Sequence, residues 1–328
     1  MSDRRTNLAL MALMVLAVMS GFAAFSIGTS PGLWVVVSHG VFGLGVLVLT
    51  PWKSSIAKRG FSRHGSTRWV STALALGVVI TLASGILLIT GVADRIGPLT
   101  TMQVHVGAGL TALALTAVHY RQRPVTPRAS DLTRRNTIRA ASLLGAAGVI
   151  YAGGEWVLGL IGAPGADRRF TGSHEIDDND PPPATQWLND SVRVIDRNAH
   201  VMTTPTGDYR FADIDEFGDT MTATLDCTGG WYATRTWSGA RLDRVLGDAS
   251  GESVVIRSVT GYWRRFPLDQ SKDLLLASRL EGEPLRSGNG APMRLVAPGR
   301  RGFWWVKWVD RIEVDDSPPW WQPPLPAA

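Results

Sequence analysis

Cys227 and three histidines are the residues of this chain whose types and positions suit metal binding. Cys227 is the only cysteine among 328 residues, so no disulfide can form within the chain. It follows the strand-like run Met221–Asp226 and precedes Thr228-Gly229-Gly230, whose glycines let the backbone turn tightly and approach a ligand. A free cysteine is often a small buried apolar residue, but a cysteine in this setting is presented at a strand end. As a thiolate it would be a soft metal ligand.

His39 and His105 lie in two different apolar runs that are long enough to cross a bilayer. Ionisable residues at membrane depth are rare and usually functional. Both histidines lie near the outer ends of their runs, and small residues that let a flat macrocycle approach follow each of them. Two imidazoles from neighbouring helices can ligate a b-type haem. We prefer this interpretation to a pair of hydrogen-bonded structural histidines.

His119 is a candidate ligand of a second haem. It lies fourteen residues after His105, which returns it to nearly the same helix face about 21 Å further along the axis. That spacing would suit a haem near the inner surface, with His64 in a basic loop as the candidate partner. The alternative, which we prefer for His119 and His64, is that both are interfacial histidines among basic residues.

Five apolar runs reach roughly the 20 residues needed to cross a bilayer, approximately Leu8–Ile27, Leu33–Thr50, Val70–Thr90, Thr101–Tyr120 and Ile138–Ile161. The first is not a cleavable signal peptide on this interpretation, because further spans follow it. Basic residues concentrate in the loops 51–69 and 121–136, and positive loops stay in the cytoplasm. The pattern predicts a multi-pass protein of the cell membrane with a cytoplasmic N-terminus and an extracytoplasmic C-terminal part.

The composition divides the chain into two domains joined by a linker. We expect an all-α five-helix transmembrane bundle over 1–162, a linker rich in Gly, Pro and Asp over 163–183, and a soluble domain over 184–328, whose fold begins near residue 168. The net charge of +5 is no nucleic-acid signal, because the basic residues cluster between hydrophobic runs.

Short runs typical of strands dominate the soluble part and predict a β-rich α+β domain. They are Val192–Asp196, Tyr209–Ile214, Met221–Asp226, Ser253–Val259, Leu274–Ser278, Met293–Val296 and Trp304–Val309, with one helical stretch at Gly239–Gly247.

Arg134 and Arg135 stand directly before the last apolar run, in Thr133-Arg134-Arg135-Asn136-Thr137-Ile138-Arg139. The stretch resembles a twin-arginine export signal placed inside the chain, and it is equally compatible with ordinary positive-inside charge. The twin-arginine export machinery transports folded domains. A domain that receives its cofactor in the cytoplasm must cross the membrane in the folded state.

Two long motifs in the soluble part, in the right order, resemble the sulfite oxidase-type molybdopterin domain over roughly Phe170 to Val314. The first is Leu225-Asp226-Cys227-Thr228-Gly229-Gly230-Trp231 followed by Trp237-Ser238-Gly239-Ala240-Arg241-Leu242. The second is Asn289-Gly290-Ala291-Pro292-Met293-Arg294-Leu295-Val296-Ala297-Pro298-Gly299, continuing through Gly302 to Val306-Lys307-Trp308. Asn289 departs from the family's usual histidine, and Trp304-Trp305 replace an arginine and a small polar residue found in many members.

The resemblance implies a role for each matching residue. Cys227 would bind molybdenum, and Arg294 with Lys307 would bind the pterin phosphate. Tyr262 occupies the family's Gly-Tyr position near the active site, the alternative being a half-buried strand aromatic. Further contacts to the cofactor would come from Phe170, Thr171, Ser173, Thr228 and Gly302.

The combined pattern predicts a membrane-anchored molybdenum oxidoreductase that transfers an oxygen atom to or from a small molecule such as a sulfoxide. A b-type haem in the bundle would relay electrons to or from quinone or a redox partner. The alternatives are a membrane cytochrome or anchored binding protein whose outer domain keeps the fold without molybdenum catalysis, and a haem-free anchor. Candidate pocket cations are Arg235, Arg257, Arg264, Arg265 and Arg300.

Overall fold

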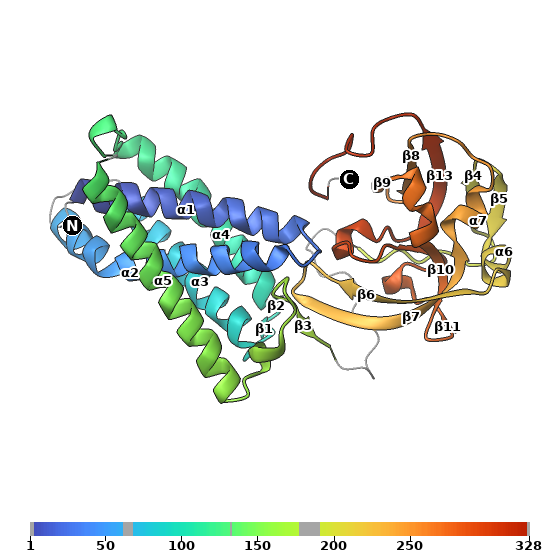
Figure 1. Ribbon diagram of the computed structural model, residues 1–328, viewed down its shortest axis with the longest axis horizontal. Helices are drawn as coiled ribbons and strands as arrows, with labels where there is room; N and C mark the ends of the chain where they lie inside the picture. The colour runs from blue at the N-terminus through green and yellow to red at the C-terminus, as the bar shows by residue number, and fades with distance from the viewer. Residues whose placement is uncertain (1–2, 62–67, 132, 177–190, 327–328) are drawn as a thin grey trace. The chain divides into compact units, whose positions relative to one another are not determined.

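The computed structural model describes residues 3–61, 68–131, 133–176 and 191–326, and they form two compact units (Figure 1). The first unit runs to Phe25 and from Ser30 to His174; the second holds Ser26–Thr29 and the chain from Glu175 onward. Candidate partner His64 lies outside the described residues. Each unit is described separately below.

Five long helices build the first unit, and each coincides with one predicted apolar run. They are α1 (Asp3–Ser26), α2 (Gly32–Phe61), α3 (Arg68–Thr90), α4 (Thr101–Gln122) and α5 (Arg134–Leu160). All five are long and apolar enough to cross a membrane. The helix α2 continues beyond the predicted end at Thr50, because a single proline, Pro51, does not interrupt it. Helix α3 packs on α4 and α2 on α5.

Helix α4 begins after a short hairpin of β1 (Arg95–Ile96) and β2 (Leu99–Thr100). The Thr100 hydroxyl accepts a hydrogen bond from the Gln103 backbone at 3.1 Å, and the Gln103 side chain accepts one from the Thr100 backbone at 2.8 Å. This capping box satisfies two N–H groups that the first helical turn leaves unpaired.

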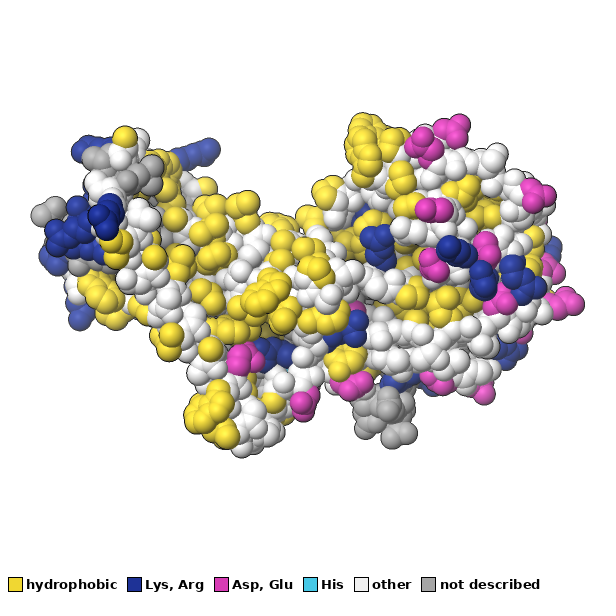
Figure 2. All heavy atoms as spheres, viewed as in Figure 1, with side chains coloured by type: hydrophobic (Ala, Val, Ile, Leu, Met, Phe, Trp, Pro, Cys, Tyr) yellow, Lys and Arg dark blue, Asp and Glu magenta, His cyan; other side chains and the backbone are white. Residues whose placement is uncertain are grey.

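The surface of the helical unit separates apolar from basic side chains. Figure 2 shows hydrophobic side chains along the helices and Lys and Arg gathered at one end of this unit. Large apolar side chains are exposed on the surface of this unit; Val79 is 60% and Val149 is 73% exposed. Soluble proteins rarely expose continuous apolar surface of this kind.

Residues Ala163–His174, which the sequence assigns to a linker, belong to the first unit. The reason is a set of hydrogen bonds made by Arg168 and His174. Arg168 donates to the Ile89 carbonyl at 3.1 Å and pairs with the Glu155 carboxylate, and the His174 ring bonds the Leu88 carbonyl at 2.6 Å. The short helices η1 (Ala129–Asp131) and η2 (Pro164–Asp167) complete this unit.

The second unit is a β-rich α+β domain, as predicted, and its main strands form two sheets. One sheet contains β6 (Asp219–Asp226), β7 (Trp231–Arg241), β10 (Leu275–Leu280), β11 (Glu283–Pro284) and β12 (Arg294–Val296). The other has the order β5 (Gly207–Arg210), β4 (Val201–Thr204), β13 (Val309–Asp315), β8 (Ser253–Ser258) and β9 (Trp263–Pro267). Strand β3 (His174–Glu175) straddles the boundary between the units.

The helices of the second unit are short: α6 (Phe211–Glu216), α7 (Leu242–Leu246), η3 (Leu268–Asp273), η4 (Ser287–Asn289) and η5 (Gly302–Trp304). One apolar core holds the domain together. At its centre the rings of Trp237 and Trp305 meet edge to face, with centroids 5.6 Å apart, and both side chains are almost fully buried.

Four predicted strands are confirmed as β6, β8, β10 and β12. The prediction was wrong for Val192–Asp196, which forms no strand, and for Trp304–Val309, where η5 and irregular chain precede β13. Tyr209–Ile214 divides between the end of β5 and α6.

The predicted helix Gly239–Gly247 shortens to α7, because its first residues are the end of β7. A Cβ on Gly239 would lie 2.1 Å from the Leu276 carbonyl oxygen in the neighbouring strand, so only glycine lets the two strands approach this closely.

Candidate functional site

Cys227 lies at the tip of the β6–β7 hairpin, where the strand-end pattern predicts it. Its backbone N–H donates to the Trp231 carbonyl at 2.9 Å, and the Gly230 N–H donates to the Cys227 carbonyl at 3.1 Å. Gly230 has φ +92°, a conformation open to glycine at little cost. The Gly229 N–H points to the Cys227 sulfur at 3.3 Å. The turn therefore holds the sulfur in place while leaving the residue half-buried.

A buried ion pair between Asp226 and Arg301 supports this turn from behind. The Arg301 guanidinium donates to the Asp226 carboxylate at 2.6 Å, and the two side chains are only 4% and 3% exposed. Another Arg301 nitrogen donates to the Cys227 carbonyl at 3.3 Å. A Cβ on Gly302 would lie 3.2 Å from the Cys227 Cα, so this segment packs tightly where it crosses the turn.

Arg294 is a buried cation without a counter-ion. It is 2% exposed and donates to the carbonyls of Asn289 at 3.0 Å and Trp305 at 3.4 Å. Its guanidinium carbon lies 5.1 Å from the Trp237 ring centroid. Its Nε has no hydrogen-bond partner, and no carboxylate among the described residues pairs with it. Burial lowers the pKa of Arg294 to about 10, while the nearby Cys227 raises it, so the group stays charged at neutral pH.

Lys307 lies beside Arg294, as the family resemblance implies. The two residues form an isolated antiparallel β-bridge. Between them lies Gly290, whose φ is +103°; a Cβ there would come within 3.0 Å of the Arg294 Cβ and 3.1 Å of the Lys307 Cβ. A buried charge normally needs a paired charge. The buried Arg294 charge, with Lys307 next to it and no carboxylate paired with Arg294 among the described residues, therefore makes this a place for an anion.

The residues around Cys227 fit an anionic, metal-bearing cofactor. The buried Trp231 Nε1, which lies beside Gly229, has no hydrogen-bond partner among the described residues, as is true of the Arg294 Nε. Buried polar groups are rarely left unpaired, so these two donors call for acceptors supplied by a ligand. Thr228 is buried in the same turn.

The electrostatics of Cys227 oppose ionisation until a metal binds. Burial raises the pKa of the Cys227 thiol, and so does Asp226; the Gly229 N–H and the cations Arg301 and Lys307 act in the opposite direction. Metal binding removes the thiol proton, so coordination is the process that would convert this residue to a thiolate.

Tyr262 is tied to the segment that follows Gly302. Its hydroxyl donates to the Phe303 carbonyl at 2.5 Å and accepts a hydrogen bond from the Arg264 Nε at 2.6 Å. Arg264 is 1% exposed, and its guanidinium carbon lies 4.9 Å from the Phe303 ring centroid. The ring of Tyr262 is half-buried against the core. Its catalytic role stays a prediction.

The candidate pocket cations differ in how they are neutralised. Arg257 pairs with Glu313 at 2.8 Å, and Arg265 pairs with Asp315. Arg235 and Arg264 are buried, while Arg300 donates to the Gln270 side chain at 3.1 Å. Arg257 and Arg265 are therefore poor candidates for holding a substrate anion, because a carboxylate already occupies each.

The predicted entry segment lies in the first unit. Thr171 and Ser173 are buried there, their hydroxyls 3.4 Å apart, and the Arg169 guanidinium stacks 4.5 Å from the centroid of the Phe170 ring. A cofactor contact by Phe170, Thr171 or Ser173 stays a prediction.

His39 and His105 meet across the helical unit, as predicted. Their ring centroids are 5.9 Å apart and the ring planes are at 81°. The Nδ1 of His39 lies 2.9 Å from the Ala17 carbonyl, and the Nδ1 of His105 lies 2.9 Å from the Thr81 carbonyl. A carbonyl only accepts, so each Nδ1 carries the proton and each Nε2 carries a lone pair.

This separation would suit two imidazoles that bind one metal ion. Two imidazoles bound to the same metal through bonds of about 2 Å each have ring centroids about 6 Å apart. Metal-bound histidines usually donate their other N–H to a carbonyl, as both do here. A Cβ on Gly21 or Gly85 would touch the histidine rings at 3.2 and 3.1 Å, so small residues line the pair. No group of three or more His, Cys, Asp or Glu side chains suited to a metal occurs in the part of the chain that the structure describes.

His119 lies on α4 with its Nδ1 3.3 Å from the Ser71 hydroxyl of α3. No histidine within the described residues lies opposite it at this level, and its role as a haem ligand stays a prediction.

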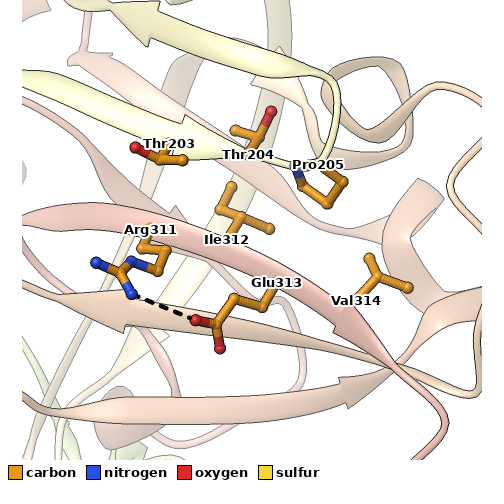
Figure 3. Close-up of a pocket in the computed structure, with 7 residues that line it drawn as sticks. All are labelled: Thr203, Thr204, Pro205, Arg311, Ile312, Glu313 and Val314. Carbon is orange, nitrogen blue, oxygen red and sulfur yellow. Dashed lines mark ion pairs between the residues drawn. The ribbon is translucent and has the colours of Figure 1, made fainter.

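A shallow hollow of about 390 Å³ opens elsewhere on the second unit, between β4 and β13 (Figure 3). It contains none of the predicted site residues, and the pair Arg311–Glu313 on its floor spans 3.7 Å. It contains neither the thiol nor the uncompensated Arg294 cation of the Cys227 site.

Comparisons with known proteins agree with this geometry. Residues 192–321 match the family described as the oxidoreductase molybdopterin binding domain. The chain is similar to mitochondrial sulfite oxidase of Homo sapiens, 29% identical over 164 residues, which cover 38% of this chain and 30% of that protein. It is also similar to nitrate reductase (NADH) 1 of Oryza sativa subsp. japonica, 36% identical over 104 residues, covering 25% of this chain and 11% of that protein.

Among solved structures, the sulfane dehydrogenase SoxCD from Paracoccus pantotrophus is 25% identical, with a TM-score of 0.36, and the match covers 38% of this chain and 40% of that one. The chain spans less than a third of the length of the curated relatives described above. Residues 192–321 are thus a molybdopterin-binding oxidoreductase domain of the sulfite oxidase type.

Asp226 and Arg301 were missed from the sequence. Asp226 directly precedes the cysteine and Arg301 directly precedes Gly302, but their positions far apart in the chain hide the pairing. The only hint in the sequence was that a charged residue of opposite sign stands next to each of two site residues, Cys227 and Gly302.

We expect the change Asp226→Asn to destabilise the second unit by about 3–5 kcal/mol, because it leaves the buried Arg301 charge unpaired. Denaturant unfolding of the full chain, followed by tryptophan fluorescence, measures the effect. The matched control is Asp243→Asn, which removes a partner of Arg241 in a surface pair with side chains 35% and 44% exposed; its cost should be about 0–1 kcal/mol. Equal costs for the two variants would contradict the structural role of the buried pair.

Alkylation of Cys227 should depend on pH in the cofactor-free protein. Because burial raises the pKa of the thiol and the thiolate is the nucleophile, the rate with iodoacetamide should still be rising at about pH 9, above the ordinary pKa of about 8.5. Mass spectrometry of timed samples measures it. The alkylation rate of the unfolded chain should reach its plateau at a lower pH than that of the folded protein. A plateau reached at lower pH by the folded protein would refute the raised pKa.

Proposed function

We propose that the molybdopterin-binding oxidoreductase domain of residues 192–321 is the catalytic part of a membrane-anchored oxidoreductase that transfers an oxygen atom to or from a small substrate such as a sulfoxide. Electrons pass between the domain and quinone or a redox partner through a b-type haem in the helical unit. Five helices long and apolar enough to cross a membrane support the anchoring.

The buried, uncompensated charge of Arg294 beside Cys227 is the observation that carries the catalytic proposal. A bound molybdenum–molybdopterin supplies two-electron oxygen-atom transfer chemistry. Cys227 would hold the metal, while Arg294 and Lys307 would hold the pterin phosphate with fixed charges. The Gly229 N–H keeps the Cys227 sulfur oriented. Tyr262 would present its hydroxyl to substrate, positioned by Arg264 and the Phe303 carbonyl.

The orientation in the membrane follows from the charges of the connecting loops. Lys and Arg concentrate in 51–69 and 121–136 and gather at one end of the helical unit. Positive loops stay in the cytoplasm, which makes the catalytic domain extracytoplasmic. Arg134 and Arg135 at the start of α5 would then direct export of the folded domain through the twin-arginine machinery.

Molybdenum content tests the catalytic proposal. Full-length protein matured in a host that makes the cofactor should contain about one molybdenum per chain, measured by mass spectrometry of the metal. Cys227→Ser should lose it, and Arg294→Lys should retain less, because Lys lacks the planar fork that binds phosphate at two points. Arg286→Lys, a change at an exposed position, is the control and should retain the full amount. If wild-type protein from this host contains no molybdenum, the result would favour an anchored binding protein instead.

The visible spectrum of purified membranes tests the haem. A Soret band should be present, and His39→Ala or His105→Ala should each remove the same component of it, because both rings belong to one site. His200→Asn, at a ring that bonds the Val309 carbonyl in the second unit, should leave the band unchanged. A spectrum without a Soret band would make the helices an anchor only.

A further inference from the structure

The first four helices form two hairpins that repeat the same side-chain contacts. In α1–α2, His39 contacts Ser20 and Ala17 of the preceding helix; in α3–α4, His105 contacts Ser84 and Thr81. The partners are 19 and 22 residues apart in the first hairpin and 21 and 24 in the second. A glycine follows the serine in both hairpins, at a position where a Cβ would press on the histidine ring.

The same repeat continues at a second level of the helices. His119 of α4 contacts Ser71 of α3 across 48 residues, and Lys53 of α2 contacts Asn7 of α1 across 46 residues. The separation of the two partners is again slightly larger in the second hairpin, by the same difference as at the upper level. Lys53 also follows His39 by fourteen residues, as His119 follows His105. Lys53 therefore occupies the position where the repeat has a histidine.

Each of the two side chains at this second level contacts a side chain of the preceding helix. The Lys53 Nζ donates to the Asn7 Oδ1 at 2.9 Å, and the His119 Nδ1 lies 3.3 Å from the Ser71 hydroxyl. In the tautomer whose Nδ1–H donates to the Ser71 hydroxyl, His119 carries a lone pair on Nε2, as His39 and His105 do.

We propose that Lys53 and His119 are the axial ligands of a second haem, about 21 Å along the helices from the first. The inference rests on the proposed function, which places a haem between His39 and His105. A deprotonated lysine amine has one lone pair for iron and keeps two N–H groups, one of which the Asn7 amide oxygen accepts. Coordination would release the Lys53 proton to solvent and so remove the charge of this half-buried side chain at the inner end of α2.

The ratio of haem to chain tests this ligand pair. Full-length protein should contain two haems per chain by the pyridine haemochrome assay. Lys53→Met and His119→Ala should each reduce the ratio to one while keeping the His39–His105 component. Lys58→Met, which removes an exposed lysine of the same helix, should keep two haems.

Ligand identity needs a second measurement that a structural role of Lys53 would not change. Near-infrared magnetic circular dichroism of the oxidised protein should show two charge-transfer bands, because the band position depends on the axial ligands. Lys53→His should keep two haems and shift one band onto that of the His39–His105 haem.

The outcomes separate this inference from the proposed function. A protein without haem refutes both. One haem that His39→Ala removes refutes the second site alone. Two haems with both bands unchanged in Lys53→Met refute Lys53 as a ligand.

Discussion

The ion pair between Asp226 and Arg301 is the interaction on which the geometry of the cysteine site depends. It joins the last residue of β6 to the segment before Gly302, and its side chains are almost completely buried. Because such a pair loses its hydration on burial, it contributes more to a unique arrangement than to net stability. Here the arrangement that it specifies is the one at Cys227: Arg301 also bonds the cysteine carbonyl, and Gly302 packs on its Cα.

In the helical unit, hydrogen bonds to backbone carbonyls orient the His39 and His105 rings. Ala17 and Thr81 each offer a backbone carbonyl to a histidine of the next helix, and these two hydrogen bonds set which ring nitrogen remains open. The hydroxyls of Ser20 and Ser84 add a second contact to each ring. Small residues at Gly21 and Gly85 leave the rings room to face one another.

The sequence predicts the helices better than the strands for a physical reason. An apolar run of about 20 residues has few alternatives to a helix, so all five were predicted. Strand β7 was missed although its Trp, Tyr and Thr residues are types enriched in strands. Its last residues, from Gly239, were assigned to a helix, whereas pairing with β6 and β10 keeps the strand extended to Arg241. The turn at Cys227 was predictable because its glycines follow a strand directly. The Asp226–Arg301 pair was not, since 75 residues separate its members.

The uncompensated charge of Arg294 also bears on how the domain matures. A cation buried without an anion raises the free energy of the empty domain, whereas a bound anion would lower it. Binding free energy then becomes folding free energy, since a ligand that binds only the folded state stabilises it by mass action. Loaded chains would resist unfolding and proteolysis better than empty ones. The same buried arginine, if it holds the cofactor as proposed, would therefore let the cell distinguish a finished protein from an unfinished one.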